Sequence, residues 1–264
     1  MSTTAAPHPS SSSRPAMREP VATCPDRRWV GWRSFGRWPL MIAVAATFAS
    51  CASSRARHVS EDASGGPVEH DDRFRRFNDP EKWAAVFDDP ERDAWQKPEH
   101  VVDVLDLEPG MTVADVGAGT GYFEPHLSRA VGASGAVIAV DVEPGMVAYM
   151  RDRFQKEGLD NAEARLGTAD DPQLDPYSVD RILIVNTWHH IPARPTYAQR
   201  LYDALASGGR LVIVDYTLDS PAGPPRHHRI PRENVIETLE SAGFIASNAD
   251  DELPRQYIVT ATKP

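Results

Sequence analysis

Three glycines alternate in the stretch of this chain that has the clearest chemical pattern. A short apolar run carries Asp115, and Gly117, Gly119 and Gly121 follow it at every second position. Glycine has no Cβ, so it adopts positive φ values and lets a ligand approach the backbone closely. A strand that leads through such a turn into a helix builds the nucleotide-binding crevice of many α/β sheets. The stretch therefore predicts a bound nucleotide or nucleoside.

A second acidic residue stands where a nucleoside would need it. Asp141 lies 20 residues beyond Gly121, at the end of another apolar run. A carboxylate at that distance can accept hydrogen bonds from both ribose hydroxyls, and Glu143 is the alternative acid. The turn that binds nicotinamide dinucleotides needs a third glycine at the position of Tyr122. A nicotinamide-dependent oxidoreductase is therefore disfavoured.

Apolar runs that alternate with helical patterns place these residues in one sheet. β-Branched runs separated by helices indicate a parallel sheet covered on both faces. We expect strands at residues 112–116, 136–141, 162–166, 179–185, 210–215 and 256–262, with a short strand opening after residues 243–244. We expect the main helices at residues 123–131, 144–156, 195–206 and 232–242.

Turn residues mark where the helices begin and end. The helix 195–206 is expected to end at a glycine cap over residues 207–209, because glycine takes the left-handed conformation there. Before the first strand, three shorter helices are expected to begin near residues 80, 90 and 98, each with proline in its first turn. Their tryptophans, Trp83 and Trp95, are expected to pack in the core.

The glycine stretch resembles the first motif of a known enzyme family. Asp115 followed by Gly-x-Gly-x-Gly after a strand is similar to the first motif of the class I S-adenosylmethionine-dependent methyltransferases. The resemblance covers about residues 74–264. It implies an α/β fold, a three-layer Rossmann-like methyltransferase sandwich. Its seven-stranded, mostly parallel sheet has an antiparallel last strand between strands five and six. The resemblance also implies S-adenosyl-L-methionine as cofactor and methyl transfer by direct displacement.

The resemblance assigns the cofactor site to a small set of residues. It implies contacts from Asp115, Gly117, Ala118, Gly119, Gly121 and Tyr122 in the first motif, and it gives the ribose to Asp141. Many relatives have an aspartate in a Gly-Asp-Ala sequence after the third strand, where it binds the adenine amino group. This chain has Thr168 at that place, so Thr168, Ala169 and Asp170 are the candidates for the adenine contact.

The loop after the fourth strand carries the candidate catalytic residues. The resemblance places Asn186 beside the methionine end of the cofactor. His189 and His190 follow, and either is a candidate general base because imidazole titrates near neutral pH. Each histidine has an alternative role, a hydrogen bond to the backbone of this turn. A metal site that joins these two residues to His227 and His228 is not expected, because their spacing matches no zinc motif.

Composition limits the partners. The chain has 264 residues, which is room for one α/β domain with extensions. Residues 1–51 hold six arginines and two acidic residues, a net charge of +4, so the remainder carries −14 and the whole chain −10. The negative charge of the residues after position 51 would repel the phosphates of a nucleic acid, which argues against a nucleic-acid partner. A small or lipophilic methyl acceptor is expected instead. Both cysteines, Cys24 and Cys51, lie before the domain, which therefore has no cysteine nucleophile and no thiolate metal site.

The N-terminal segment resembles an export signal. Arginines at positions 27, 28, 33 and 37 precede an apolar run over 39–49, which is too short to span a bilayer and typical of a signal peptide. Small residues before Cys51 resemble a bacterial lipobox, with Phe48 where leucine is usual. We expect a disordered N-terminus and lipoprotein-like signal at 1–51, a linker at 52–73 and the methyltransferase domain at 74–264. The paired arginines leave twin-arginine export as an alternative.

Besides the disfavoured oxidoreductase, two functions remain open from the sequence. The first is a methyltransferase acting on an unidentified small or lipophilic acceptor. It would lie on the periplasmic or other extracytoplasmic side of a membrane, attached through Cys51, with a cytoplasmic location as the alternative. The second is a ligand-binding lipoprotein that keeps the methyltransferase fold without catalysis, because fold alone does not fix function. Export favours the second, since S-adenosylmethionine is made in the cytosol.

Overall fold

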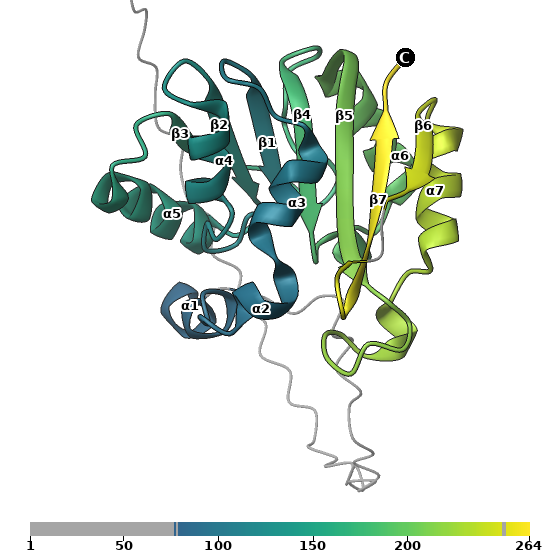
Figure 1. Cartoon of the computed structure of the whole chain (residues 1–264), viewed down its shortest axis with the longest axis horizontal. Helices are drawn as coiled ribbons and strands as arrows, with labels where there is room; N and C mark the ends of the chain where they lie inside the picture. Colours follow the sequence, from purple (N-terminus) through teal and green to yellow (C-terminus); the bar gives the residue numbers. More distant parts are fainter. Residues whose placement is uncertain (1–76, 78, 250–251) are drawn as a thin grey trace, which may run out of the picture. The chain divides into compact units, whose positions relative to one another are not determined.

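The computed structural model describes residue 77 and the ranges 79–249 and 252–264. The segments expected as a signal region (1–51) and a linker (52–73) lie outside these residues. One seven-stranded sheet organises the described chain (Figure 1). In the order in which they lie across the sheet, its strands are β3 (Ala162–Leu166), β2 (Ala136–Asp141), β1 (Thr112–Val116), β4 (Val179–Val185), β5 (Leu205–Tyr216), β7 (Gln256–Thr262) and β6 (Ile245–Asn248). Six strands are parallel and β7 is antiparallel between β5 and β6, which confirms the predicted fold.

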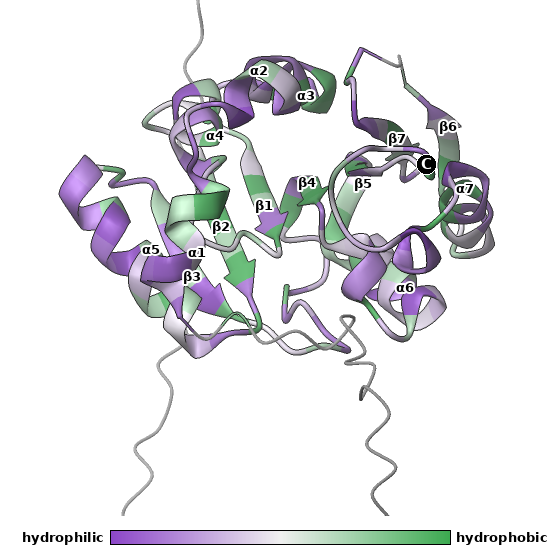
Figure 2. Ribbon diagram, turned by 90° about the horizontal axis from the view of Figure 1, so that it is seen from below, coloured by the Kyte–Doolittle hydropathy of each residue, from purple (hydrophilic) through white to green (hydrophobic). Residues whose placement is uncertain are grey.

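Helices cover both faces of the sheet. One face carries α3 (Pro98–Leu105), α4 (Glu124–Val131) and α5 (Pro144–Glu157), and the other carries α6 (Arg194–Ala204) and α7 (Arg232–Ser241). Successive strand residues point to opposite faces, so β4 sends Leu183 to the first layer and Ile182 and Ile184 to the second. In Figure 2 the hydrophobic green accordingly marks strands such as β2, while much of α5 and α7 is hydrophilic purple.

Two short helices lie across the edge at which the parallel strands end. These are α1 (Pro80–Phe87) and α2 (Arg92–Gln96), below the sheet in Figure 1. No residue of α1 is fully buried, and Trp83 and Trp95 are only half-buried, so the prediction that they pack in the core was wrong. Trp83 instead stacks on Phe87, with ring centroids 5.4 Å apart. A Cβ placed on Gly119 would lie 3.4 Å from the Phe87 ring, so this aromatic layer covers the glycine stretch.

The start of β5 differs from the prediction. The sequence predicts a helix to residue 206 and a glycine cap at 207–209, but α6 ends at Ala204 and the chain is extended from Leu205. Leu205 is fully buried and pairs with Val179 of β4, so sheet pairing ends the helix early. The backbone N–H of Gly208 binds the carbonyl of Lys263. The positive φ of Gly208, 75°, therefore serves the strand rather than a helix cap.

Candidate functional site

The glycine loop, residues 117–121, leaves β1 at the carboxyl edge of the sheet. Its three glycines have positive φ values of 82°, 61° and 85°. The N–H groups of Gly117 and Ala118 donate to the carbonyl of Val140 at 2.7 and 3.1 Å, which fixes the loop to the end of β2. A Cβ on Gly117 would lie 2.2 Å from Oγ1 of Thr187. The glycine loop and the loop after β4 therefore pack against each other as one surface.

Asp141 lies beside the glycine loop, as the sequence predicts. Its Oδ2 accepts a hydrogen bond from the N–H of Gly119 and its Oδ1 accepts one from the N–H of Glu143, both at 2.9 Å. Burial raises the pKa of this carboxyl, and the two N–H groups oppose the rise. Nearby, at the ends of β2 and β3, the apolar side chains of Val142 and Leu166 are 51% and 47% exposed. A nucleoside fits this arrangement, because an adenine ring would cover the apolar pair while its ribose reached Asp141.

The loop after β3 lies at the same edge. The N–H of Gly167 donates to the carbonyl of Asp141 at 2.9 Å. The three residues that follow, Thr168, Ala169 and Asp170, are all exposed. The three candidates for the adenine contact thus follow a residue that is bonded to Asp141, the ribose candidate. The structure does not choose among the three.

Two buried carboxyl groups lie at the glycine loop. Asp115, in β1, is 2% exposed, and Glu124, the first residue of α4, is fully buried. Burial raises the pKa of Asp115 to about 7, with the cation of Arg92 opposing the rise and the charge of Asp141 adding to it. Burial, together with the charge of Asp115, also raises the pKa of Glu124, whose carboxyl oxygens have no hydrogen-bond partner among the described residues. Glu124 was not predicted, because an acid in the first turn of a helix is ordinary.

The Glu124→Gln variant is expected to gain stability over the wild type as the pH rises. An acid with a raised folded pKa keeps its proton after the unfolded chain has lost it. The free energy of unfolding therefore falls from about pH 4.3, the ordinary pKa of Glu, until the folded pKa is reached. Glutamine does not titrate, so the variant lacks this loss. Urea unfolding between pH 5 and pH 8 measures the difference, with the exposed Glu240→Gln as control. A difference that is constant with pH would contradict a proton held at Glu124.

A histidine and an aspartate form a buried pair where β4 and β5 end. His189 lies in the short 3-10 helix η2 (Trp188–His190), and Asp215 lies near the end of β5. Nδ1 of His189 is 2.8 Å from Oδ1 and 3.0 Å from Oδ2 of Asp215, and the two side chains are 4% and 1% exposed. The carboxylate also accepts hydrogen bonds from the N–H groups of His189 and Tyr216. Because Nδ1 is held by a carboxylate, Nε2 is the nitrogen that can act as a base.

His190 lies in a different environment from its neighbour. Its ring centroid is 4.2 Å from that of His189 and 5.7 Å from that of Phe77, which also contacts Trp83 at 4.8 Å. The geometry favours His189 as the general base, because a carboxylate orients its ring, and this role stays a prediction. Asp215 was not predicted as a site residue, although an acid at the end of a strand was a signal for it.

Asn186 lies in a ring of three amide side chains. Nε2 of Gln96 donates to Oε1 of Gln256 at 2.8 Å, and Nε2 of Gln256 donates to Oδ1 of Asn186 at 2.6 Å. Nδ2 of Asn186 donates to Oε1 of Gln96 at 3.5 Å, which closes the ring. Asn186 has a φ of +54°, in the left-handed region that asparagine tolerates better than most residues. The ring joins the ends of α2, β4 and β7, and neither glutamine carried a sequence signal, since glutamine is mostly exposed.

Polar side chains bind α1 and α2 to the glycine loop. Oγ1 of Thr120 donates to Oδ1 of Asp88 at 2.9 Å, and the hydroxyl of Tyr122 donates to Asp93. The guanidinium of Arg92 lies 3.8 Å from the centroid of the Tyr122 ring. The hydroxyl and the ring of Tyr122 are therefore both engaged with α2, which leaves its backbone for a ligand.

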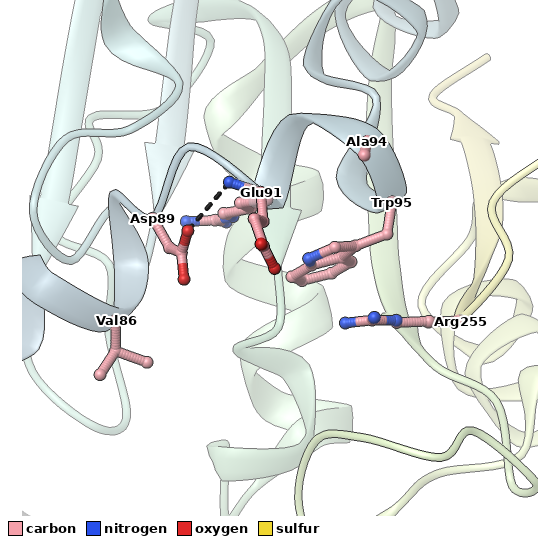
Figure 3. Close-up of a pocket in the computed structure, with 7 residues that line it drawn as sticks. Val86, Asp89, Glu91, Ala94, Trp95 and Arg255 are labelled. Carbon is pink, nitrogen blue, oxygen red and sulfur yellow. Dashed lines mark hydrogen bonds between the residues drawn. The ribbon is translucent and has the colours of Figure 1, made fainter.

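A cavity of about 460 Å³ opens beside α2. Figure 3 shows the guanidinium of Arg255 next to the Trp95 ring, and its central carbon is 4.9 Å from the ring centroid. On the other side of the cavity, Asp89 accepts a hydrogen bond from the N–H of Glu91 at 2.9 Å. The Tyr216 ring centroid is 6.3 Å from that of Trp95, so the aromatic wall continues toward the end of β5.

Comparisons with known proteins agree on one family. A model described as a methyltransferase domain matches residues 113–209. The crystal structure of a SAM-dependent methyltransferase from Aquifex aeolicus is 31% identical, with 70% of this chain and 99% of that chain covered and a TM-score of 0.66. The ubiquinone/menaquinone biosynthesis C-methyltransferase UbiE of Hydrogenovibrio crunogenus is 24% identical over 170 residues, 64% of each chain. An arsenite methyltransferase of Halobacterium salinarum is 30% identical over 115 residues, 44% of this chain and 29% of the relative.

The sheet order, the glycine loop and the acid at the end of β2 define a Rossmann-like protein that binds a nucleoside at the carboxyl edge of its sheet. The chain belongs to the S-adenosylmethionine-dependent methyltransferase family, and its cofactor is S-adenosyl-L-methionine. The chain spans less than two thirds of the length of these two curated relatives, which are named for different reactions.

Replacing Asp141 with alanine is expected to weaken the binding of S-adenosylhomocysteine at least about tenfold, or 1.4 kcal/mol, because two ribose hydroxyls would lose the acceptor that the sequence predicts for them. Isothermal titration calorimetry measures the affinity. Glu143→Ala is the matched control, since Glu143 is the neighbouring acid and donates only its backbone N–H to Asp141. If Glu143→Ala weakened binding and Asp141→Ala did not, the ribose role would belong to Glu143.

Proposed function

We propose that this chain transfers the methyl group of S-adenosylmethionine to a small or lipophilic acceptor, with His189 as general base. S-adenosylmethionine supplies an activated sulfonium methyl group, so the protein has to bind, align and, for a protonated acceptor, remove a proton. The observation that carries the proposal is the buried pair of His189 and Asp215 at the carboxyl edge of the sheet. The glycine loop packs against the loop that leads into η2, which supports a position of this pair near the proposed cofactor site.

The pair suits an acceptor that has a proton on its reacting atom. Nε2 of His189 takes the proton of an acceptor hydroxyl or amine while the bond from the acceptor to the methyl carbon forms and the bond from that carbon to sulfur breaks. Asp215 keeps the ring oriented through Nδ1 and stabilises the imidazolium that results. Because both side chains are almost fully buried, bulk water has little access to the proton transfer.

Two measurements on the full chain test this function. Calorimetric titration with S-adenosylmethionine and S-adenosylhomocysteine should show saturable binding of both. Incubation with methyl-labelled S-adenosylmethionine and a panel of hydroxyl, amine and thiol compounds should label at least one compound with a protonated nucleophile. Absence of binding would refute the proposal. Binding without transfer to any compound would favour a ligand-binding protein that keeps the fold without catalysis.

We also propose that the domain is exported and anchored to a membrane through Cys51. The support comes from the sequence, in which arginines, a short apolar run and small residues precede that cysteine. Within residues 77, 79–249 and 252–264, no helix has the length and apolar character needed to cross a membrane. In this proposal, a covalent lipid on Cys51 carries the attachment.

The Cys51→Ala variant is expected to leave the membrane fraction, because it lacks the thiol that would carry the lipid. Fractionation of cells that express the full chain, followed by immunoblotting, measures the distribution. Cys24→Ala is the matched control and should still partition with membranes. Globomycin, which blocks lipoprotein processing, should make the precursor accumulate. A Cys51→Ala protein that remained in the membrane fraction would refute the anchor.

A further inference from the structure

A cavity of about 220 Å³ lies between the loops that follow β4 and β5. Five of its lining residues are basic: His189, His190, Arg194, His227 and His228. They come from three elements, which are η2, the first turn of α6 and the 3-10 helix η3 (Arg226–His228). The remaining lining residues are apolar, and none of the lining residues in the described ranges is acidic.

Two of the four histidines are buried at this cavity, while His190 is half-buried and His227 is exposed. His189 and His228 are 5% and 7% exposed. The ring centroids of His189 and His190 are 4.2 Å apart, and those of His227 and His228 are also 4.2 Å apart. The carboxylate of Asp215 holds Nδ1 of His189. Two imidazole groups therefore line the cavity from η2 and two from η3.

Arg229 fixes the loop that carries η3. Its guanidinium donates to five backbone carbonyls at 2.7 to 3.1 Å, those of Thr217, Leu218, Ser220, Ala222 and Pro224. In the same loop, a Cβ on Gly223 would lie 2.7 Å from the Tyr216 ring, so the backbone packs directly on that ring. The loop is internally bonded and packed, which gives His227 and His228 defined places opposite η2.

This chemistry suits an anion. A guanidinium binds oxyanions through parallel N–H donors, and imidazoles add further donors. Arg194 also stands in the first turn of the 11-residue helix α6, where the helix dipole adds positive potential. The groups are not arranged for a metal, since no three His, Cys, Asp or Glu side chains of the described ranges could hold one. Donors from three elements suit a tetrahedral oxyanion better than a planar carboxylate.

We propose that this cavity binds a phosphate group of the methyl acceptor. The inference rests on the proposed function, because His189 belongs both to the cavity and to the pair that would deprotonate the acceptor. The phosphate lies toward Arg194 and His227, the apolar side chains of Ile191 and Ile230 contact the adjoining carbons, and the reacting hydroxyl or amine faces Nε2 of His189. The acceptor is then a phosphate ester, either soluble or the head group of a lipid.

Calorimetric titration of the full chain with inorganic phosphate tests the site. The wild type should bind phosphate saturably. Arg194→Gln and His227→Gln should each weaken that binding at least about tenfold, because each removes a donor to the oxyanion. Arg226→Gln is the matched control and should leave it unchanged, since Arg226 lies in the same 3-10 helix, is exposed and does not line the cavity. The affinity for S-adenosylhomocysteine, measured on the same proteins, should not change.

The outcomes separate the two proposals. A wild type that binds S-adenosylhomocysteine but not phosphate would overturn the phosphate site and leave the methyltransferase proposal standing. An equal loss of phosphate binding in Arg226→Gln would also overturn the site, because it would reveal a diffuse charge effect. Failure to bind S-adenosylhomocysteine would count against the proposed function instead. Competition by glycerol phosphate would support a soluble acceptor, and competition by vesicles with phosphatidic acid alone would support a lipid.

Discussion

Replacing His189 with glutamine is expected to slow methyl transfer by about 10²- to 10⁴-fold, the usual contribution of a general base. Glutamine has an N–H group that can bind Asp215, so the buried carboxylate keeps a partner while the basic nitrogen is lost. The affinity for S-adenosylhomocysteine should stay the same, because the residues predicted to bind the cofactor are others. Single-turnover rates with an acceptor found in the panel measure the effect.

Two further variants make this result specific. His190→Gln should slow transfer far less, because Asp215 orients the ring of His189, whereas the ring of His190 packs against those of Phe77 and His189. Asp215→Asn should slow transfer strongly, since an amide orients the ring less well and cannot stabilise an imidazolium. Equal losses in the two histidine variants would contradict the assignment of the base to His189.

Replacing Gly117 with alanine is expected to destabilise the protein by about 2 to 5 kcal/mol. The φ of Gly117 is +82°, and a residue with a Cβ costs about 1 to 2 kcal/mol in that region. The new Cβ would also lie 2.2 Å from Oγ1 of Thr187, and overpacking typically adds about 1 to 3 kcal/mol. The loop after β4 would have to move, so the cofactor affinity should fall as well. Urea unfolding and calorimetry measure the two losses.

Gly158→Ala is the matched control for this substitution. Gly158 also has a positive φ, +68°, but a Cβ there would meet nothing within 4 Å. Its variant should therefore show only the backbone cost and no change in cofactor affinity. If both variants lost the same stability, the tight packing of Gly117 against Thr187 would be wrong.

The sequence could predict those site residues that lie at, or shortly after, the end of a single strand. The end of an apolar run marks the end of a strand, and parallel strands end at the same edge of a sheet. Asp141, Asn186 and His189 each follow or end such a run, and the structure brings them to one edge. The antiparallel position of β7 was also predicted, from the resemblance, and is confirmed.

Residues that meet from distant parts of the chain could not be predicted in this way. His189 and Asp215 are 26 residues apart, and Gln96 and Gln256 are 160 apart. Each contact depends on how the strands and the edge helices are arranged, which no local pattern contains. The early start of β5 has the same origin, because pairing of Leu205 with Val179 outweighed the local glycine signal for a helix cap.

The ring of Gln96, Asn186 and Gln256 has a consequence for how these residues are conserved during evolution. Each amide donates one hydrogen bond to the next amide and accepts one from the third, so the three hydrogen bonds run around the ring in one direction. Exchanging one of them for a carboxylate would remove a donor, and exchanging one for an apolar residue would leave each of the other two amides without one of its hydrogen bonds. In proteins that descend from this one, we therefore expect the three amide residues to be conserved together or replaced together.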